Sequence, residues 1–477
     1  MQNAQFLTQS RSAAGRIGVT FRRAYYPRSP GEGELGDYPP FQPKEFFNHK
    51  ERKDRRGETN KNNQPASVHF FAGITPPTSP FATGRCSFLA TMPDDAVINS
   101  LYVHVPFCVR KCAYCAFYSE AGDGELVNRY VRALIQEMEM VAAELRPQTV
   151  FFGGGTPTLL NLRQWRAIFE AMERLGLLGA TEWTVECNPA TVSADKARLL
   201  RDRGVNRVSM GVQSFEPAML ERLGRVHSRE MIFKSFDILR AAGFDNMNLD
   251  LMFAIPGQTM EMWRATLAEA VALGSEHLAC YEVIYEEDTP LFHQLRAGKV
   301  SSDEDLACAM YDELLAAAAA AGFQQYEVAN FARGGGGRGE LPERACRHNV
   351  NYWRGGWYHG LGPSASGYVA GRRATNVANT TRYCEQLERG LRAIDFSEEL
   401  PPLARAGELA AFGLRMSAGW PLALFQQRTG FALQREWAPE IQRMIQLGYG
   451  QLDDERFQLT RQGLRFADWV GAEFLRS

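Results

Sequence analysis

Three cysteines close together near position 110 could hold a metal centre. Cys108, Cys112 and Cys115 follow the spacing C-x3-C-x2-C, and Arg110 and Lys111 between them favour the thiolate form that binds metals. A structural zinc ion needs four ligands. An iron–sulfur cluster ordinarily takes four cysteines, so a set of three leaves one iron open to a substrate. The spacing alone leaves zinc, a cluster and three unrelated cysteines as alternatives.

Further along the chain, a glycine cluster and several polar residues could bind a charged or hydroxyl-rich ligand. The segment Phe151-Phe-Gly-Gly-Gly-Thr-Pro157 would let backbone N–H groups approach such a ligand closely. Glu186, Gln213 and Asp250 offer carboxylate or amide groups, and Arg225 offers a cation. Taken singly, each of these side chains is equally expected to satisfy backbone groups at the rim of a barrel.

The elements that must position these residues follow a repeated pattern. Short apolar or β-branched runs alternate with amphipathic helical stretches, which indicates βα units around a parallel sheet. The expected strands are Ser100–Val105, Thr149–Phe152, Glu182–Glu186, Arg207–Gly211, Asn246–Met252 and His277–Val283. The expected helices are Glu125–Glu144, Leu162–Leu175, Ala194–Arg203, Arg229–Ala242 and Met260–Leu273. Six units fit an incomplete parallel (β/α)6 barrel, with the polar residues at the carboxyl ends of its strands.

The chain of 477 residues is long enough for two or three domains. We expect a barrel over residues 96–333, a linker and motif region over 334–399, and a smaller, mostly helical, winged-helix-like domain over 400–477 with a strand pair near Gly450–Leu459. Residues 1–95 lack sustained periodicity, so they are interpreted as a disordered extension or, preferably, as the result of a start codon placed ahead of Met92.

The composition of the chain restricts the cellular location and the binding partners that we expect for it. The 53 basic and 55 acidic side chains nearly cancel, which disfavours binding to nucleic acid. The longest apolar stretch is too short for a membrane span. Nine cysteines, an odd number in a large chain, favour a reducing, cytoplasmic location. The alternative is a mitochondrial address, since five arginines and no acid precede Glu32.

Three cysteines at this spacing after a first strand resemble the radical S-adenosylmethionine (SAM) superfamily. In that family three thiolates hold a [4Fe–4S] cluster, and its open iron is chelated by the amino and carboxylate groups of SAM. An electron from the cluster then cleaves SAM to a 5′-deoxyadenosyl radical. The resemblance implies that Cys108, Cys112 and Cys115 are the metal ligands and that the segment Gly154-Gly155-Thr156 binds the methionyl amino group.

Over about residues 97–470 the chain is similar to the subgroup that contains the oxygen-independent coproporphyrinogen III oxidases (HemN) and the heme chaperones (HemW). This resemblance implies that the cluster and SAM are lined by two tyrosines and that four further side chains complete the SAM pocket. These residues are Tyr102 and Tyr114, with Glu186 at the adenosyl part and Gln213, Arg225 and Asp250 around it.

Two features distinguish members of the subgroup. Oxidase-type sequences have a further cysteine two residues after the motif, where this chain has Phe117 as the chaperones do. His348-Asn-Val-Asn-Tyr352-Trp353 is similar to the H-N-x-x-Y-W motif that is implicated in heme handling. His348 would be an axial heme ligand, with Cys346 and His359 as lower-ranked alternatives. The structural alternative is that His348 hydrogen-bonds within the fold while the aromatic rings fill a domain junction.

The resemblance therefore favours a chaperone that binds heme and delivers it to a respiratory protein. The alternative is a coproporphyrinogen III dehydrogenase-type enzyme of porphyrin biosynthesis, in which the radical abstracts hydrogen from a propionate and CO2 is lost. A third interpretation, from a different class, is a zinc-stabilised binding module without redox chemistry. The sequence leaves the oligomeric state open, with a homodimer as one candidate.

Overall fold

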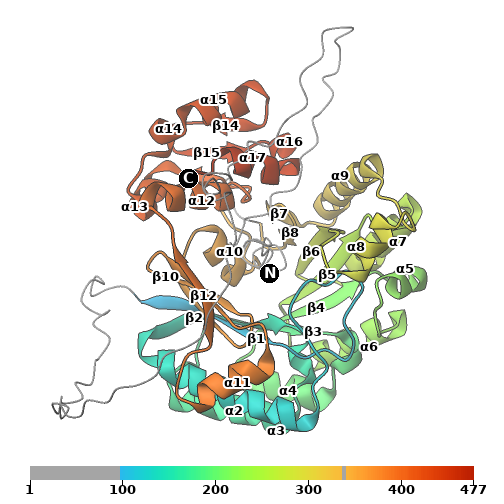
Figure 1. The fold of residues 1–477 in the computed structure, drawn as a ribbon. Coiled ribbons are helices and arrows are strands. Elements are labelled where there is room, and N and C mark those ends of the chain that lie inside the picture. Colours follow the sequence, from blue (N-terminus) through green and yellow to red (C-terminus); the bar gives the residue numbers. More distant parts are fainter. Residues whose placement is uncertain (1–96, 336–339, 477) are drawn as a thin grey trace, which may run out of the picture. The chain divides into compact units, whose positions relative to one another are not determined.

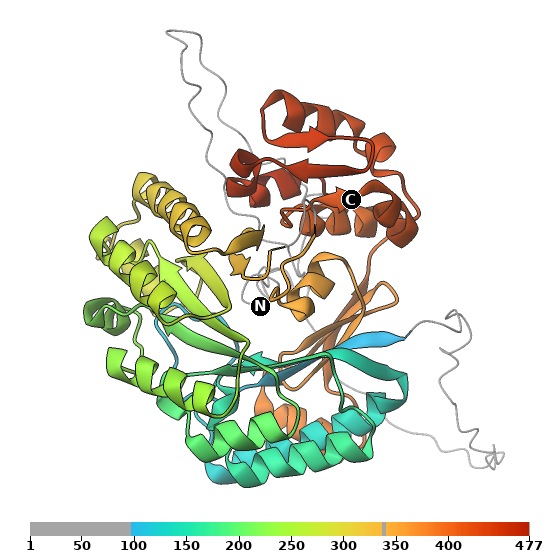
Figure 2. The same cartoon turned by 180° about the vertical axis from the view of Figure 1, so that it is seen from behind.

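Six parallel strands form the centre of the main sheet. The computed structural model describes residues 97–335 and 340–476, so the predictions for residues 1–95 lie outside the described residues. The strands are β1 (Ile98–Val105), β2 (Leu145–Gly154), β3 (Glu182–Cys187), β4 (Arg207–Gln213), β5 (Met247–Phe253) and β6 (His277–Glu282), and each pairs in parallel with the next. All six predicted strands are confirmed to within four residues, and they form the curved wall seen in Figures 1 and 2.

Five helices cross between these strands and cover the outer face of the sheet (Figure 1). They are α2 (Gly124–Val141), α3 (Leu162–Arg174), α4 (Ala194–Asp202), α6 (Arg229–Ala241) and α7 (Met260–Ala272). Each begins at a polar side chain that accepts a hydrogen bond from a backbone N–H in the first turn, which satisfies one donor that the helix leaves free. These caps are Asp123, Asn161, Ser193, Ser228 and Thr259. The short α5 (Pro217–Arg222) lies between β4 and α6.

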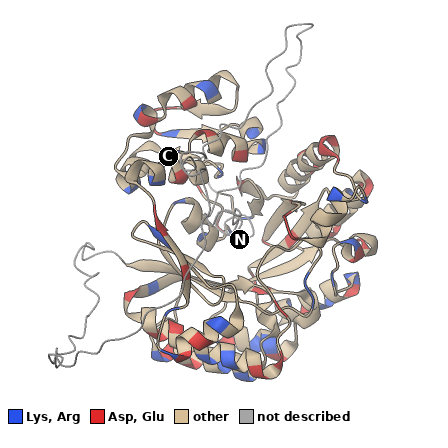
Figure 3. Ribbon diagram, viewed as in Figure 1, with Lys and Arg blue, Asp and Glu red and all other residues tan. Residues whose placement is uncertain are grey.

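Positions of basic and acidic residues are intermingled along the ribbons of these outer helices (Figure 3). Ion pairs such as Arg174–Glu139 and Arg229–Glu269 join neighbouring helices there. The helices therefore do not offer the continuous basic track that nucleic-acid binding uses.

The sheet extends beyond the six strands on both sides. After α8 (Pro290–Arg296) and α9 (Glu304–Ala320), the antiparallel pair β7 (Gln324–Glu327) and β8 (Asn330–Ala332) continues the sheet from β6. On the other side, β9 (Tyr358–Leu361) is parallel to β1, and β10 (Ser366–Val369), β11 (Arg372–Asn376) and β12 (Ile394–Glu399) follow it antiparallel. Within the described residues this makes a mixed sheet of twelve strands.

The region 334–399, interpreted from the sequence as a linker with a motif, thus supplies strands and two helices to the main fold. The helices are α10 (Arg347–Trp353), which carries the H-N-x-x-Y-W motif, and α11 (Thr380–Glu388). These strands are only four to six residues long and carry few runs of buried apolar residues, so their sequence has no clear strand period.

A second, smaller core lies in the C-terminal region, where helices and a short strand pair were expected. The helices are α12 (Pro402–Gly413), α13 (Leu422–Thr429), α14 (Leu433–Glu436), α15 (Ala438–Gln446), α16 (Arg461–Arg465) and α17 (Ala467–Glu473). The predicted strand pair is β14 (Gly450–Leu452) and β15 (Arg456–Leu459), joined by β13 (Trp420–Pro421). Trp420, Phe425 and Trp437 pack edge to face in this core. No helix of the described residues is both long and apolar enough to cross a membrane.

Glu137 of α2 links the barrel by hydrogen bonds to segments that come late in the sequence. Its fully buried carboxylate accepts hydrogen bonds from the backbone N–H of Gly362 (2.9 Å), the amide of Asn376 (2.8 Å) and the hydroxyl of Tyr383 (2.7 Å). A buried carboxylate is tolerated when several donors surround it, as they do here. One acid on an early helix therefore orders three segments that lie more than 200 residues later.

We expect Glu137→Gln to lower the free energy of unfolding by about 2 kcal/mol, because the amide turns an N–H group toward donors that need an acceptor. Urea unfolding followed by circular dichroism measures this change. Glu139→Gln is the matched control, since Glu139 makes only an exposed ion pair with Arg174. Equal stability of the two variants would contradict the anchoring role.

Candidate functional site

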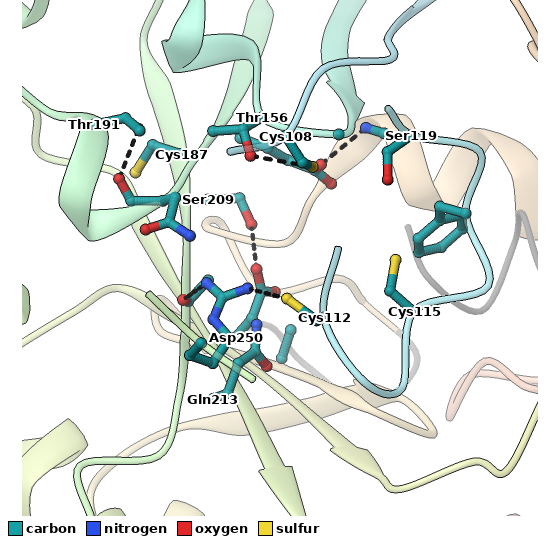
Figure 4. Close-up of a pocket in the computed structure, with 18 of the residues that line it drawn as sticks. Cys108, Cys112, Cys115, Ser119, Thr156, Cys187, Thr191, Ser209, Gln213 and Asp250 are labelled. Atoms are coloured by element: carbon teal, nitrogen blue, oxygen red, sulfur yellow. Dashed lines mark hydrogen bonds between the residues drawn. The ribbon is translucent and has the colours of Figure 1, made fainter. Parts of the chain in front are cut away.

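A cavity opens at the carboxyl ends of the parallel strands. Its empty volume is about 1110 Å³, including the part open to solvent. The lining comes from the loop after β1 and from the ends of β2 to β6 (Figure 4). Of the residues predicted for the cluster and SAM, eleven line it: Cys108, Cys112, Tyr114, Cys115, Gly154, Gly155, Thr156, Glu186, Gln213, Arg225 and Asp250.

Backbone hydrogen bonds hold the loop that carries the three cysteines in place. Cys108 donates its N–H to the carbonyl of Glu120 (3.1 Å), and Ala113 donates to the carbonyl of Leu223 (3.0 Å). The Cys108 sulfur lies 3.5 Å from the Thr156 hydroxyl, and the Cys112 sulfur accepts from the Arg225 guanidinium at 3.4 Å. The Cys108 and Cys112 thiols are thus held at the cavity by partners from the loop after β2 and from the segment after β4.

The surroundings of these thiols fit a positively charged metal group. Burial, followed by the charge of Cys112, raises the pKa of Cys115 to about 12, and burial likewise raises the pKa of Cys108. Without a metal both would stay protonated, whereas bound iron stabilises the thiolate. Among the described residues, no three Cys, His, Asp or Glu side chains converge on a point that could hold a single ion. A cluster presents separate irons to separate thiolates, so its ligands need not converge.

The glycine segment after β2 packs against the cysteine loop. The N–H of Gly155 donates to the carbonyl of Val105 (2.8 Å), and that of Thr156 to the carbonyl of Phe107 (2.7 Å). A Cβ at Gly154, where φ is +98°, would lie 2.5 Å from the His104 ring. The glycines are therefore required for this close approach, and the N–H groups that the sequence suggested for a ligand are used within the fold. That the segment contacts SAM stays a prediction.

Two half-buried carboxylates, Glu186 and Asp250, line the cavity. Burial, and then the negative charge of Asp250, raise the pKa of Glu186 to about 7. Glu186 accepts from the N–H of Gly154 at 3.1 Å. Asp250 accepts from Asn248 (2.9 Å) and from Ser209 (3.2 Å), while its burial raises its pKa. Both groups retain acceptor capacity for the hydroxyls of a ribose.

Gln213 and Arg225 complete this side of the cavity. Gln213 ends β4 at a bulge with φ of +68°, a left-handed conformation that is strained for a residue with a side chain. Its amide oxygen is buried with no hydrogen-bond partner among the described residues, so an amino group of a ligand would satisfy it. Arg225 donates to the carbonyl of Gly211 (2.6 Å) as well as to Cys112, and so links the end of β4 to the cysteine loop.

Tyr102 and His348, two of the predicted site residues, do not line the cavity. The buried Tyr102 hydroxyl lies 3.0 Å from His104 Nδ1 and donates to it, since His104 Nε2–H donates to the carbonyl of Tyr118. His348 is fully buried, with Nδ1 hydrogen-bonded to Thr149 (2.9 Å) and Nε2 to Tyr352 (2.8 Å). This geometry matches the structural alternative for His348 and leaves no ring nitrogen open to iron in this conformation.

The two lower-ranked heme ligands are also engaged. The Cys346 thiol donates to Glu182 and burial raises its pKa to about 12. His359 Nε2 lies 3.1 Å from the carboxylate of Glu144.

Several cavity residues were missed in the sequence. Arg207, Ser209, Asn248 and Asn349 all line the cavity. Arg207, Ser209 and Gly211 alternate along β4, as Asn248 and Asp250 do along β5, which places each set on one face of its strand. A period of two among the polar residues of otherwise apolar strands was the signal that could have found them.

Comparisons with known proteins identify the superfamily and the fold. Residues 102–270 match the family model of the radical SAM superfamily, and residues 400–466 match that of the HemN C-terminal domain. The solved structure of coproporphyrinogen III oxidase (HemN) from Escherichia coli matches 80% of this chain and 90% of its own chain, with a TM-score of 0.68 and 23% identity, which shows the same fold. Fold and cavity together thus define a radical SAM protein.

Two curated relatives specify the family. The heme chaperone HemW of Lactococcus lactis is 32% identical over 79% of this chain and 97% of its own length, and that of Bacillus subtilis is 33% identical over 79% and 99%. The chain belongs to the HemW family. Membership implies a [4Fe–4S] cluster and SAM as cofactors; when bound, the reduced cluster supplies the electron that cleaves SAM.

We expect Cys112→Ala to abolish the iron and sulfide content and the brown colour of the anaerobically reconstituted protein, because a cluster held by three thiolates loses one of them. Cys187→Ala is the matched control, since Cys187 is a buried cysteine that lines the same cavity outside the triad. Retention of a full cluster in Cys112→Ala would refute the ligand assignment.

We expect SAM to bind more tightly as the pH rises from about 6 to about 8, because Glu186 with a pKa near 7 then loses its proton and becomes the better acceptor for a hydroxyl. Calorimetric titration with SAM at several pH values measures this trend. In Glu186→Gln the trend should flatten; an unchanged pH profile would remove Glu186 from the SAM site.

Proposed function

We propose that the chain is a heme chaperone that binds heme and delivers it to a respiratory protein. The observation that carries this proposal is the similarity to two HemW proteins over nearly their whole lengths. Phe117 supports it, because this buried cavity residue stands where oxidase-type sequences have a further cysteine.

The roles of the cavity residues follow from their positions. Cys108, Cys112 and Cys115 are proposed to hold the cluster, while Glu186, Gln213, Arg225 and Asp250 bind SAM. Their side chains leave defined acceptors for the hydroxyl and amino groups of a ligand. In this proposal the bound cofactors set the conformation of the chaperone, and turnover of SAM is slow or conditional.

His348 is the proposed axial heme ligand. Its pKa is lowered to about 3, first by burial, so the imidazole is neutral and able to donate a lone pair to iron. To do so it must give up its hydrogen bond to Thr149 or to Tyr352. In this proposal the aromatic side chains of Tyr352, Trp353 and Trp357 stack on the flat macrocycle once the helix has shifted.

We expect His348→Ala to weaken heme binding at least about tenfold, equal to about 1.4 kcal/mol, because the iron loses an axial ligand. Hemin titration followed by the heme absorption band measures the dissociation constant. His293→Ala, at an exposed position on α8, is the control.

Unchanged heme affinity in His348→Ala would move the ligand elsewhere. A second experiment tests the oxidase alternative. The reconstituted protein is incubated anaerobically with reductant, SAM and coproporphyrinogen III. Decarboxylated porphyrin detected by mass would make the protein an oxidase and refute the chaperone proposal.

A further inference from the structure

Helix α10 is closed over His348 in this structure. Both ring nitrogens of His348 are hydrogen-bonded and its side chain is fully buried. If His348 binds heme iron, as the proposed function requires, α10 must have a second position in which one ring nitrogen is open. What holds α10 in the closed position therefore decides when heme can bind.

A chain of buried hydrogen bonds leads from the start of α10 to the cavity. The N–H of Cys346, the residue before the helix, donates to the hydroxyl of Tyr326 at 3.2 Å. That hydroxyl lies 2.8 Å from His277 Nε2. His277 Nδ1 lies 2.6 Å from the amide oxygen of Asn248, whose amide nitrogen donates to Asp250 at 2.9 Å. The chain joins β7, β6 and β5 and ends on a carboxylate that lines the cavity.

The bonding capacity of each group fixes the direction of the chain. Asn248 donates through its nitrogen to both Asp250 and Ser209, so its oxygen must accept from His277 Nδ1–H. His277 is a neutral imidazole, because burial lowers its pKa well below 6.5, and its Nε2 must then accept from Tyr326. Every donor consequently points toward Asp250, an arrangement in which each hydrogen bond strengthens the next.

A second set of contacts restrains α10. Glu182 of β3 accepts from the N–H groups of Arg347 (2.9 Å) and His348 (3.0 Å), which holds the first turn of the helix to the barrel. Asn349, beside His348, lines the cavity, and its buried amide oxygen has no hydrogen-bond partner among the described residues. The helix thus has one side toward the cavity and carries His348 on another.

We propose that α10 is a latch whose closed position is held by the chain Cys346–Tyr326–His277–Asn248–Asp250, so that a ligand at Asp250 and heme at His348 are energetically coupled. Tyr326 and His277 are positioning residues. Asp250 has a free lone pair for a ribose hydroxyl, and a hydroxyl that donates to it withdraws negative charge from the carboxylate. The hydrogen bond from Asn248 then weakens, and with it the chain that depends on it. This favours the open position and makes His348 available.

The test is the heme affinity of the reconstituted holoprotein with and without SAM. Tyr326→Phe removes one hydroxyl and leaves the N–H of Cys346 without its acceptor in the closed position only. Loss of one such bond should open the latch and tighten heme binding about threefold to tenfold. Tyr383→Phe is the matched control, because it removes a buried hydroxyl that donates to Glu137 away from this chain. His277→Phe should act like Tyr326→Phe.

The effect of SAM on the heme affinity is the readout that a merely structural role of Tyr326 would not change. SAM should tighten heme binding to the wild-type protein at least about twofold, and this factor should fall to about one in Tyr326→Phe. Unchanged or weaker heme affinity in Tyr326→Phe, or an unchanged SAM factor, would overturn the latch. Absence of heme binding by the wild-type protein would instead refute the proposed function, and heme binding unaffected by His348→Ala would remove the ligand on which the latch depends.

Discussion

Polar side chains buried inside a parallel sheet must find partners, since water cannot supply them there. The inner face of β3 to β6 carries Glu182, Arg207, Asn248 and His277, all buried. The protein meets this requirement by joining strands and loops through side-chain hydrogen bonds across the interior. The side chains that form these hydrogen bonds with one another also determine where α10 and the cavity lie.

Arg207 illustrates how far this interior network reaches. Its guanidinium is fully buried, and its charge contributes to the lowered pKa of His277 and His348 and opposes the raised pKa of Cys346. Glu182, which raises the pKa of Arg207, is in turn used to hold the first turn of α10. Burial above all, and then this cation, keep the imidazoles of His277 and His348 neutral, which suits residues that act as acceptors or ligands.

The main elements and most of the cavity could be predicted because they depend on local signals. Apolar strand periods, helix caps and the order of βα units bring Cys108, Glu186 and Asp250 to one edge. The position of His348 could not be predicted, because its contact with Thr149 joins residues 199 apart in the sequence. Tyr102 packs with Phe151 and Cys346 behind the cavity lining, a contact between residues far apart in the sequence, and its role beside the cluster and SAM stays a prediction.

The place of β9 beside β1 has a consequence for synthesis of the chain. The strand that leads into the cysteine loop is among the first to leave the ribosome, yet the neighbour on one of its edges is encoded some 260 residues later. At roughly 5–20 residues per second, that edge stays unpaired on the order of tens of seconds. During this interval the nascent barrel has an unpaired strand edge next to the cysteine loop, so the complete sheet forms only after β9 has been synthesised.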